Sequence, residues 1–234
     1  MYVKYLAKLD RQMDSISLRI DGRDITTVNG ATILEAALEN GIYIPHLCYH
    51  PDLKPSGVCR LCQVELEDGQ PVISCRTVAE SGMVVRTSSL EVDRVRRAVI
   101  ELLIADHHSD CRNCPSSGKC ELQRIMASLH ISIKRMRPLK WPKEELPRDI
   151  SNPFFDCDPN KCMLCGICVR TCEDLHGESI LEFVGRGYST RITSFGDKSR
   201  CESCGECVVR CPVGAILRKA NQRQGSGNEI CQRQ

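Results

Sequence analysis

Two short stretches near the start of the chain alternate polar and apolar residues, the period of two that is typical of half-buried β-strands. They are Ser15–Ile20 and Ile25–Val28, and the Asp21-Gly22 pair between them favours a tight two-residue turn. The pattern therefore predicts a β-hairpin.

A helix is predicted directly after the hairpin. Thr32 and Glu35 have the spacing of a capping box, apolar residues follow at helical spacing, and Gly41 stands where a left-handed helix end is expected. A hairpin followed by a helix is how a β-grasp fold begins, so we expect an α+β protein.

Two more helices are indicated further along. The first begins with the capping-box pair Ser88 and Glu91 and ends near Asp106; its apolar positions are Val92, Val95, Val99 and Leu102, and its polar positions include Arg94, Arg96 and Arg97. The second is a short helix over residues 121–130 that has Leu122, Ile125, Met126 and Leu129 on one face. Prolines then predict an irregular linker, and Glu182–Thr190 is expected to form another hairpin.

Composition narrows the class of protein. Only 4% of the 234 residues are aromatic, which favours small modules over one large core, and a net charge of +2 argues against nucleic-acid binding and against a basic membrane anchor. The N-terminus lacks a signal-peptide pattern, and the longest apolar run, Ala98–Ala105, contains Glu101. We therefore expect no direct membrane insertion and, from the many reduced thiols, a cytoplasmic protein.

The 17 cysteines carry the clearest chemical information. Two runs share one spacing: Cys162, Cys165, Cys168 and Cys172, then Cys201, Cys204, Cys207 and Cys211. This spacing is typical of bacterial ferredoxins with two [4Fe-4S] clusters, in which the fourth thiolate of each run binds the other cluster. The predicted ligand sets are therefore Cys162, Cys165, Cys168 and Cys211 for one cluster, and Cys201, Cys204, Cys207 and Cys172 for the second.

Pro212 follows the second run as usual, whereas Glu173 replaces the proline after the first. Cys157 and Cys231 lie outside both runs and are expected to be ordinary thiols. Structural zinc usually joins two C-x2-C pairs in one tetrahedron, whereas each run here offers three closely spaced cysteines and a fourth, so the spacing argues against zinc. The odd number of cysteines argues against a disulfide framework. A zinc-binding regulatory module remains as a remote alternative.

Four earlier cysteines form a third set: Cys48, Cys59, Cys62 and Cys75. Their spacing suits a [2Fe-2S] cluster, and Gly57 supplies permissive backbone just before the central pair. His50 is expected to be a surface or hydrogen-bonding residue, because the four thiolates already complete the site. The alternative is that these are scattered core cysteines.

The surrounding residues make a resemblance specific. The stretches Cys48-Tyr-His-Pro51, Gly57-Val-Cys59-Arg-Leu-Cys62-Gln-Val64 and Cys75-Arg-Thr77 resemble the start of the large iron–sulfur subunit of respiratory complex I. Iron-only hydrogenases and NAD-linked hydrogenase and formate dehydrogenase subunits share this start. The resemblance covers about residues 15–220, including the ligand-free hairpin between the two ferredoxin-type runs.

The resemblance also interprets the middle of the chain, where His107 precedes Cys111, Cys114 and Cys120. In that family, a histidine separated by three residues from the first cysteine binds the fourth iron of a [4Fe-4S] cluster, so His107 is the implied ligand. The competing interpretation is a helix-end histidine that interacts with the helix dipole. His108 is expected to play a supporting role, with Asp106 or Asp110 as its partner.

The resemblance implies an electron-transfer subunit with one [2Fe-2S] and three [4Fe-4S] clusters. In size and layout the chain is most similar to the small diaphorase iron–sulfur subunit of soluble NAD-linked hydrogenases. The implied partners are a flavoprotein that oxidises NAD(P)H and a catalytic subunit of hydrogenase or formate dehydrogenase type. Two alternatives stay open: the chain could be a subunit of an electron-bifurcating complex, or a fragment of a split catalytic hydrogenase or NADH dehydrogenase.

No substrate turnover site is expected in the chain itself. Gly185-Arg-Gly187 lacks the third glycine of a dinucleotide-binding fingerprint, and no phosphate-binding loop is present. The chain is also expected to end where catalytic relatives continue. The expected segments are an N-terminal extension (1–14), a β-grasp [2Fe-2S] domain (15–90), a helical [4Fe-4S] segment with one histidine and three cysteine ligands (91–131), a linker (132–151), a two-cluster ferredoxin domain (152–220) and a disordered tail (221–234).

Overall fold

The computed structural model describes residues 15–108, 110–132, 145–177 and 180–219. Several expectations concern residues outside these ranges: the N-terminal extension, most of the linker, the tail and Cys231. Within them, the chain is a mixed α+β protein, as the sequence predicts.

The first module is a five-stranded sheet with the strand order β2-β1-β5-β3-β4. Its strands are β1 (Ser15–Ile20), β2 (Arg23–Val28), β3 (Gln63–Leu66), β4 (Pro71–Ile73) and β5 (Val84–Arg86). The predicted hairpin of β1 and β2 is confirmed, and Asp21 and Gly22 turn the chain with φ angles of 49° and 77°. β5 runs parallel to β1, while the remaining pairs are antiparallel.

One helix packs against this sheet. α2 (Ile33–Glu39) begins with the predicted capping box, in which Thr32 Oγ1 accepts from Glu35 N and Glu35 Oε2 accepts from Thr32 N. Ile33, Leu34 and the alanines of α2 are fully buried in the core beneath the strands. The helix therefore covers one face of the sheet and leads directly into the loop that carries Cys48.

The second helix differs from the prediction in its start and in its buried face. α3 (Leu90–Asp106) is capped by Ser89, whose Oγ accepts from Val92 N, one residue later than expected. Its buried residues are Val92, Arg96, Ile100 and Ile104. Leu102, assigned to the apolar face, is 74% exposed, because the buried stripe follows a spacing of four residues.

Arg96 differs most clearly from the sequence-based prediction: the prediction gives it a polar position on the helix, but its exposed fraction is 3%. Its guanidinium donates to three backbone carbonyl oxygens, those of Leu61, Gln63 and Thr87. A buried charge is tolerated when its donors are satisfied in this way. Arg96 thus joins α3 to the strand that follows the cysteine loop of the first module.

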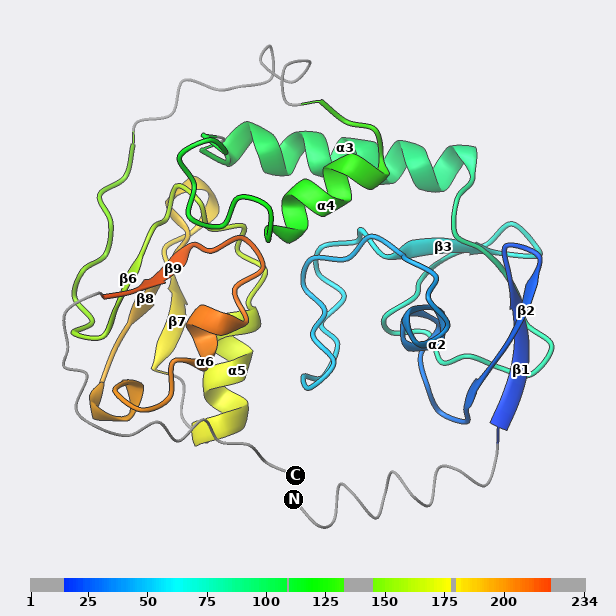
Figure 1. Ribbon diagram of the computed structural model, residues 1–234, viewed down its shortest axis with the longest axis horizontal. Helices are drawn as coiled ribbons and strands as arrows, with labels where there is room; N and C mark the ends of the chain where they lie inside the picture. Colours follow the sequence, from blue (N-terminus) through cyan, green and yellow to red (C-terminus); the bar gives the residue numbers. More distant parts are fainter. Residues whose placement is uncertain (1–14, 109, 133–144, 178–179, 220–234) are drawn as a thin grey trace.

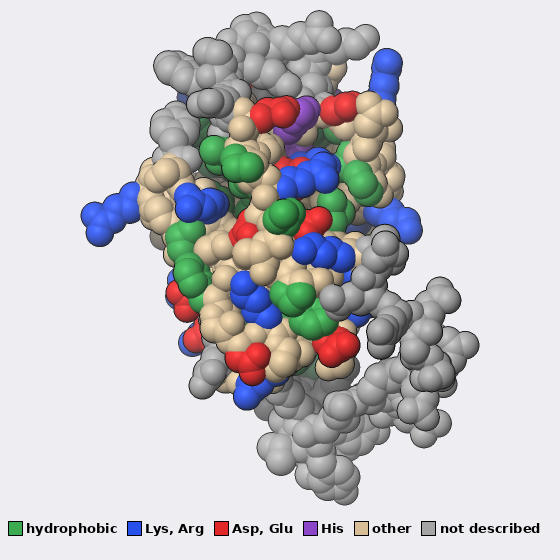
Figure 2. Space-filling model, turned by 90° about the vertical axis from the view of Figure 1, so that its left-hand side faces the viewer, with side chains coloured by type: hydrophobic (Ala, Val, Ile, Leu, Met, Phe, Trp, Pro, Cys, Tyr) green, Lys and Arg blue, Asp and Glu red, His purple; other side chains and the backbone are tan. Residues whose placement is uncertain are grey.

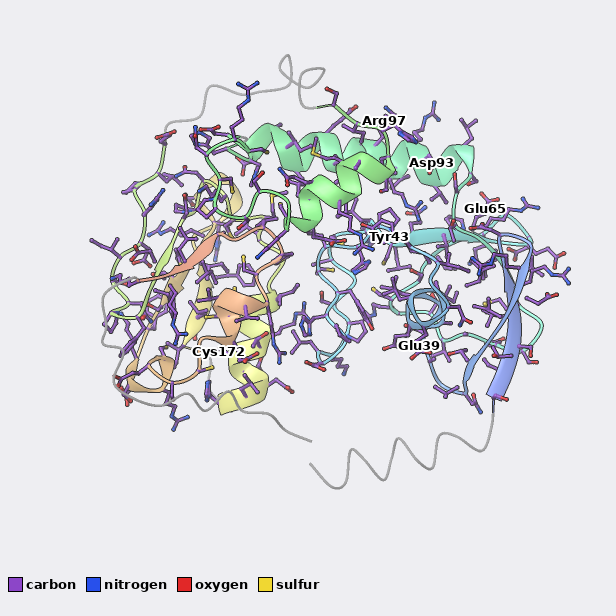
Figure 3. All side chains as sticks on the ribbon, viewed as in Figure 1. Glu39, Tyr43, Glu65, Asp93, Arg97 and Cys172 are labelled. Atoms are coloured by element: carbon purple, nitrogen blue, oxygen red, sulfur yellow. The ribbon has the colours of Figure 1, made fainter. Side chains whose placement is uncertain are left out.

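α4 (Glu121–Ser128) buries Leu122, Ile125 and Met126, as predicted, although it ends two residues early. It also contacts the first module: Tyr43 Oη donates to Glu121 Oε1 at 2.8 Å, and the Arg124 guanidinium lies 4.2 Å from the centre of the Tyr43 ring. Figure 3 shows Tyr43, in the segment of the first module that follows α2, close to α4.

The C-terminal module contains two antiparallel strand pairs and two helices. Its elements are β6 (Phe155–Cys157), α5 (Ile167–His176), β7 (Leu181–Val184), η2 (Gly187–Ser189), β8 (Arg191–Ser194), η3 (Ser199–Cys201), α6 (Glu206–Val209) and β9 (Ile216–Arg218). β7 and β8 form the expected hairpin, but β8 begins after Thr190. The pairing of β6 with β9 was not predicted, because strands of three residues leave no periodic pattern.

The two modules lie side by side, and α3 extends along both of them with α4 beneath it (Figure 1). A shared apolar cluster joins them, since Leu47 and Leu61 from the first module pack with Ile100, Leu122 and Val213. Acidic, basic and apolar side chains are interspersed over the outer face of the C-terminal module (Figure 2). Among the described residues, no helix is long and apolar enough to cross a membrane.

Candidate metal centres

The four cysteines of the first module come together from three loops. Cys48 follows α2, Cys59 and Cys62 precede β3, and Cys75 follows β4. The Cys59 thiol hydrogen-bonds to Cys48, which lowers the pKa of Cys48 and raises the pKa of Cys59. The Cys75 thiol hydrogen-bonds to Cys62, which lowers the pKa of Cys62 and raises the pKa of Cys75. Three of the four are 1% exposed, and Cys59 is half-buried.

The loop around these thiols is tightly supported. Gly57 has φ of +70°, a backbone conformation that favours glycine. A Cβ there would lie 2.7 Å from Cδ of the exposed Arg76 side chain, which can move aside, so the requirement for glycine comes from the backbone. Ser74 Oγ donates to the carbonyl oxygen of Cys62 at 2.6 Å. Together with the hydrogen bonds from Arg96, these contacts fix the backbone of the cysteine-bearing loop. His50 accepts from Asp52 N and lies 3.8 Å from the Asp52 carboxylate, in a surface role.

Three further cavities hold the other cysteines. Cavity A, between α5 and β9, is lined by the thiols Cys162, Cys165, Cys168 and Cys211. Ala215 N donates to Cys211 Sγ at 3.2 Å. Burial raises the pKa of Cys162 to about 11 and that of Cys165 to about 12. Apolar walls therefore disfavour free thiolates here, whereas iron would neutralise them.

Cavity A has a fifth cysteine in its wall. Cys157, on β6, is 7% exposed, and burial raises the pKa of its thiol to about 12. The sequence placed this cysteine outside the ligand runs but contained nothing to show that it lines the same cavity. Its backbone pairs with Ile216 of β9 and with Asp149.

Cavity B lies between α5 and α6 and is lined by Cys172, Cys201, Cys204 and Cys207. Cys172 comes from the middle of α5 (Figure 3), while the other three belong to the second run. Two nitrogens donate to sulfur here, Ile180 N to Cys172 Sγ at 3.3 Å and Asn152 Nδ2 to Cys201 Sγ at 3.6 Å. Burial raises the pKa of Cys207 to about 12.

Cavity C lies where α3 ends and α4 begins. It is lined by His107, Cys111, Cys114 and Cys120, together with Leu122 and Val213. His107 is the C-terminal cap residue of α3, and Cys120 is the N-terminal cap residue of α4. His108 pairs with Glu145, 3.0 Å from its Nδ1, and the expected Asp110 lines the same cavity as His108. Glu145 is remote in sequence, so no local pattern could predict this contact.

The four groups are close neighbours, and Cys168 of cavity A shares an apolar cluster with Cys201 and Cys207 of cavity B. Val213 lines both cavity A and cavity C, and Glu121 N donates to Pro212 O. At Gly214 the backbone comes so close that an added Cβ would lie 1.6 Å from Ser116 Oγ. Cys59 packs in the same apolar cluster as Cys162, Cys165 and Cys211. Cavity A thus adjoins the first-module thiols and cavity C.

The donor sets fit iron–sulfur clusters. Each group offers thiols, or thiols and an imidazole, within apolar walls, and backbone or amide nitrogens donate to several of the sulfurs. Such N–H donors stabilise the negative charge of a cluster. No cysteine of the described residues forms a disulfide. Among those residues, no group of three or more His, Cys, Asp or Glu side chains is arranged to hold a single metal ion.

Three known domain families match successive parts of the chain. Residues 13–89 match a 2Fe-2S iron–sulfur cluster binding domain, residues 96–135 match the NADH-ubiquinone oxidoreductase-G iron–sulfur binding region, and residues 161–215 match a 4Fe-4S dicluster domain. The chain therefore contains one [2Fe-2S] domain together with [4Fe-4S] domains.

Relatives in sequence include a protein that this chain covers almost completely and a much longer one. The gamma subunit of the NAD-reducing hydrogenase HoxS of Cupriavidus necator is 32% identical over 209 residues, which cover 88% of this chain and 88% of that protein. The alpha subunit of the NADPH-Fe(3+) oxidoreductase of Geobacter sulfurreducens is 36% identical over 90% of this chain. The chain spans only 25% of that longer protein.

The solved structures include a similar chain in a crystal structure of an NAD+-reducing [NiFe]-hydrogenase in the H2-reduced state. The TM-score is 0.75 at 35% sequence identity, and the match covers 88% of each chain. Similarity in sequence and in fold therefore extends over nearly the whole length of both chains.

Proposed function

This chain belongs to the family of iron–sulfur electron-transfer subunits that includes the gamma subunit of NAD-reducing hydrogenase, and on that premise we propose that it conducts single electrons between two partner subunits. One partner would be a flavoprotein that oxidises NAD(P)H, and the other a catalytic subunit of hydrogenase or formate dehydrogenase type. Iron–sulfur clusters supply the one-electron chemistry.

The residues that would hold the clusters follow from the four groups. Cys48, Cys59, Cys62 and Cys75 hold a [2Fe-2S] cluster in a domain of β-grasp type; His107, Cys111, Cys114 and Cys120 hold a [4Fe-4S] cluster; Cys162, Cys165, Cys168 and Cys211 hold another; and Cys201, Cys204, Cys207 and Cys172 hold the third. The mixed sheet covered by α2 supports the β-grasp assignment.

The observation that carries the proposal is the adjacency of the groups within one chain. Val213 lies between cavities A and C, and Cys59 packs beside the thiols of cavity A. Consecutive sites with shared walls suit stepwise transfer of electrons, while the protein's own side chains exclude water from the thiols. The many cysteines, none of which forms a disulfide within the described ranges, also support a cytoplasmic location.

The test is low-temperature EPR of the anaerobically purified chain during stepwise reduction, with iron and acid-labile sulfide determined on the same sample. We expect one [2Fe-2S] signal, interacting [4Fe-4S] signals and about 14 irons per chain. Fewer irons, with zinc in their place, would show that at least one group is structural and would contradict the four-site proposal.

A second measurement separates electron transfer from turnover. The isolated chain should not reduce a dye with NADH, whereas the assembled complex should. Dye reduction by the isolated chain would instead favour the alternative of a split catalytic protein.

A further inference from the structure

The loop that carries the first thiol of the proposed [2Fe-2S] site is held by the other module. Residues 48–58, all of which the structure describes, form neither helix nor strand. Within the loop, Leu53 N donates to His50 O. Such a segment needs contacts from outside to keep one conformation.

Arg170 provides these contacts from α5. Its Nη2 donates to the carbonyl oxygen of Cys48 at 2.6 Å, and its Nη1 donates to the carbonyl oxygen of Lys54 at 3.0 Å. One guanidinium thus spans both ends of a seven-residue stretch, using the planar fork that distinguishes arginine from lysine.

A second arginine holds the tip of the same loop. Arg210 Nη2 lies 3.3 Å from Asp52 Oδ2, and its Nε donates to Glu206 Oε2 at 2.9 Å. Arg210 is 14% exposed, but Asp52 is 65% exposed, so this ion pair is a weaker constraint than the bonds to backbone carbonyls. The loop lies against α5 and α6 in Figure 1.

Arg170 lies between two of the proposed cluster ligands in the sequence, so its contact with the Cys48 loop brings a positive charge from the electron path to the first module. It lies on α5 between Cys168, which lines cavity A, and Cys172, which lines cavity B. Its half-buried positive charge touches the backbone of Cys48, which carries a thiol of the first module. A fixed positive charge next to a site that gains an electron favours the reduced form, and charge and hydrogen bonds near a cluster set its potential.

We propose that Arg170 is a positioning residue of the electron path: it fixes the Cys48 loop against the helix that carries Cys168 and Cys172, and its charge raises the reduction potential of the [2Fe-2S] site. This inference rests on the proposed [2Fe-2S] site.

The test compares Arg170→Gln, Arg170→Lys and the control Arg191→Gln in the full, anaerobically purified chain. Arg191 is an exposed arginine on β8 of the same module. In EPR-monitored redox titrations, the [2Fe-2S] midpoint should become more negative in Arg170→Gln and shift less in Arg170→Lys, which keeps the charge. Arg191→Gln should match the wild type. Amide exchange across residues 48–57 should be faster in both Arg170 variants.

An unchanged midpoint in Arg170→Gln with full iron content would overturn the inference. If Arg170→Gln fails to assemble the cluster, Arg170→Lys decides: a shifted midpoint with faster exchange supports the inference, and wild-type values for both overturn it. A wild-type chain without any [2Fe-2S] signal would instead overturn the proposed function, so the two failures are distinguishable.

Discussion

At the scale of single residues, His107 is the proposed cluster ligand that the spacing of the sequence supports least. Its position in the structure therefore matters most for the ligand assignment. It ends α3, with its backbone N donating to Ile104 O, and it lines cavity C with three cysteines. His108, its neighbour, pairs with Glu145 and has a side chain that is 47% exposed. The two histidines thus have different surroundings despite being adjacent.

We expect His107→Ala to cost about four irons per chain, because one iron of the cube would lose its protein ligand. His108→Ala is the matched control and should retain full iron. Iron and sulfide analysis with EPR would report both. If His107→Ala kept its full iron content and spectrum, His107 would not be a ligand.

Arg96 shows how one buried side chain can organise a site without touching a thiol. We expect Arg96→Met to destabilise the protein by about 3 kcal/mol, because three carbonyl oxygens, one buried and two partly buried, would lose their donor. For a chain of this size this is roughly 6–12 °C in Tm. Arg97→Met is the control.

Arg97 is exposed on the same helix (Figure 3) and should change Tm little. Thermal unfolding of the anaerobic variants, followed by circular dichroism, is the measurement. Equal Tm values for the two variants would show that the Arg96 bonds to the first module do not contribute to stability.

At the scale of elements, the turn after Cys211 is built for close approach. Gly214 has φ of +63°, and the loop containing Ser116 occupies the space that a side chain would need. The turn therefore packs the segment that follows Cys211 against the cysteine loop of cavity C. Both the conformation and the contact require glycine.

We expect Gly214→Ala to destabilise the protein by more than Gly69→Ala. Gly69 also has a positive φ, of +83°, but no atom lies within 4 Å of its added Cβ, so that variant reports backbone strain alone, about 1–2 kcal/mol. The excess should appear as a lower Tm and reduced iron content. Adding Ser116→Gly should recover part of it.

Equal losses in the two glycine variants, or no recovery on adding Ser116→Gly, would mean that the close approach of these two loops is not a constraint on the folded protein.

At the scale of the whole molecule, the two modules depend on metal to different degrees. The first module has a continuous apolar core of strand and helix residues, including Ile20, Ile33, Leu34 and Val85. The smaller apolar cluster of the C-terminal module includes Cys157 and Cys168, and its strands have three or four residues. Small modules of this kind usually need a bound metal for stability.

We therefore expect removal of iron by a chelator to unfold the C-terminal module first. Amide hydrogen exchange followed by mass spectrometry should show lost protection across residues 155–218, while β1, β2 and α2 keep most of theirs. The untreated protein is the control. Retained protection in the C-terminal module would show that its core is sufficient without the clusters.

Local structure was predictable because its causes are local. The hairpin of β1 and β2, the capping box of α2, the apolar face of α4 and the β7–β8 hairpin all follow from residues a few positions apart. The buried face of α3 was not predictable, because arginine is a charged residue and Arg96 is buried only where carbonyl oxygens from remote segments accept its hydrogen bonds. The pairing of β6 with β9 likewise depends on distant residues.

The sequence by itself determined the chemistry of this protein, since the spacing of cysteines within each run limits which clusters they can bind; the ligand bonds themselves stay a prediction. Only the tertiary structure decided what surrounds those thiols: Cys157 in the wall of cavity A, Ser116 against Gly214, and Arg170 on the carbonyl of Cys48. The physical reason is the distance along the chain over which each interaction acts. Spacing and capping act over a few residues, whereas burial and contacts between modules arise only when remote segments pack together.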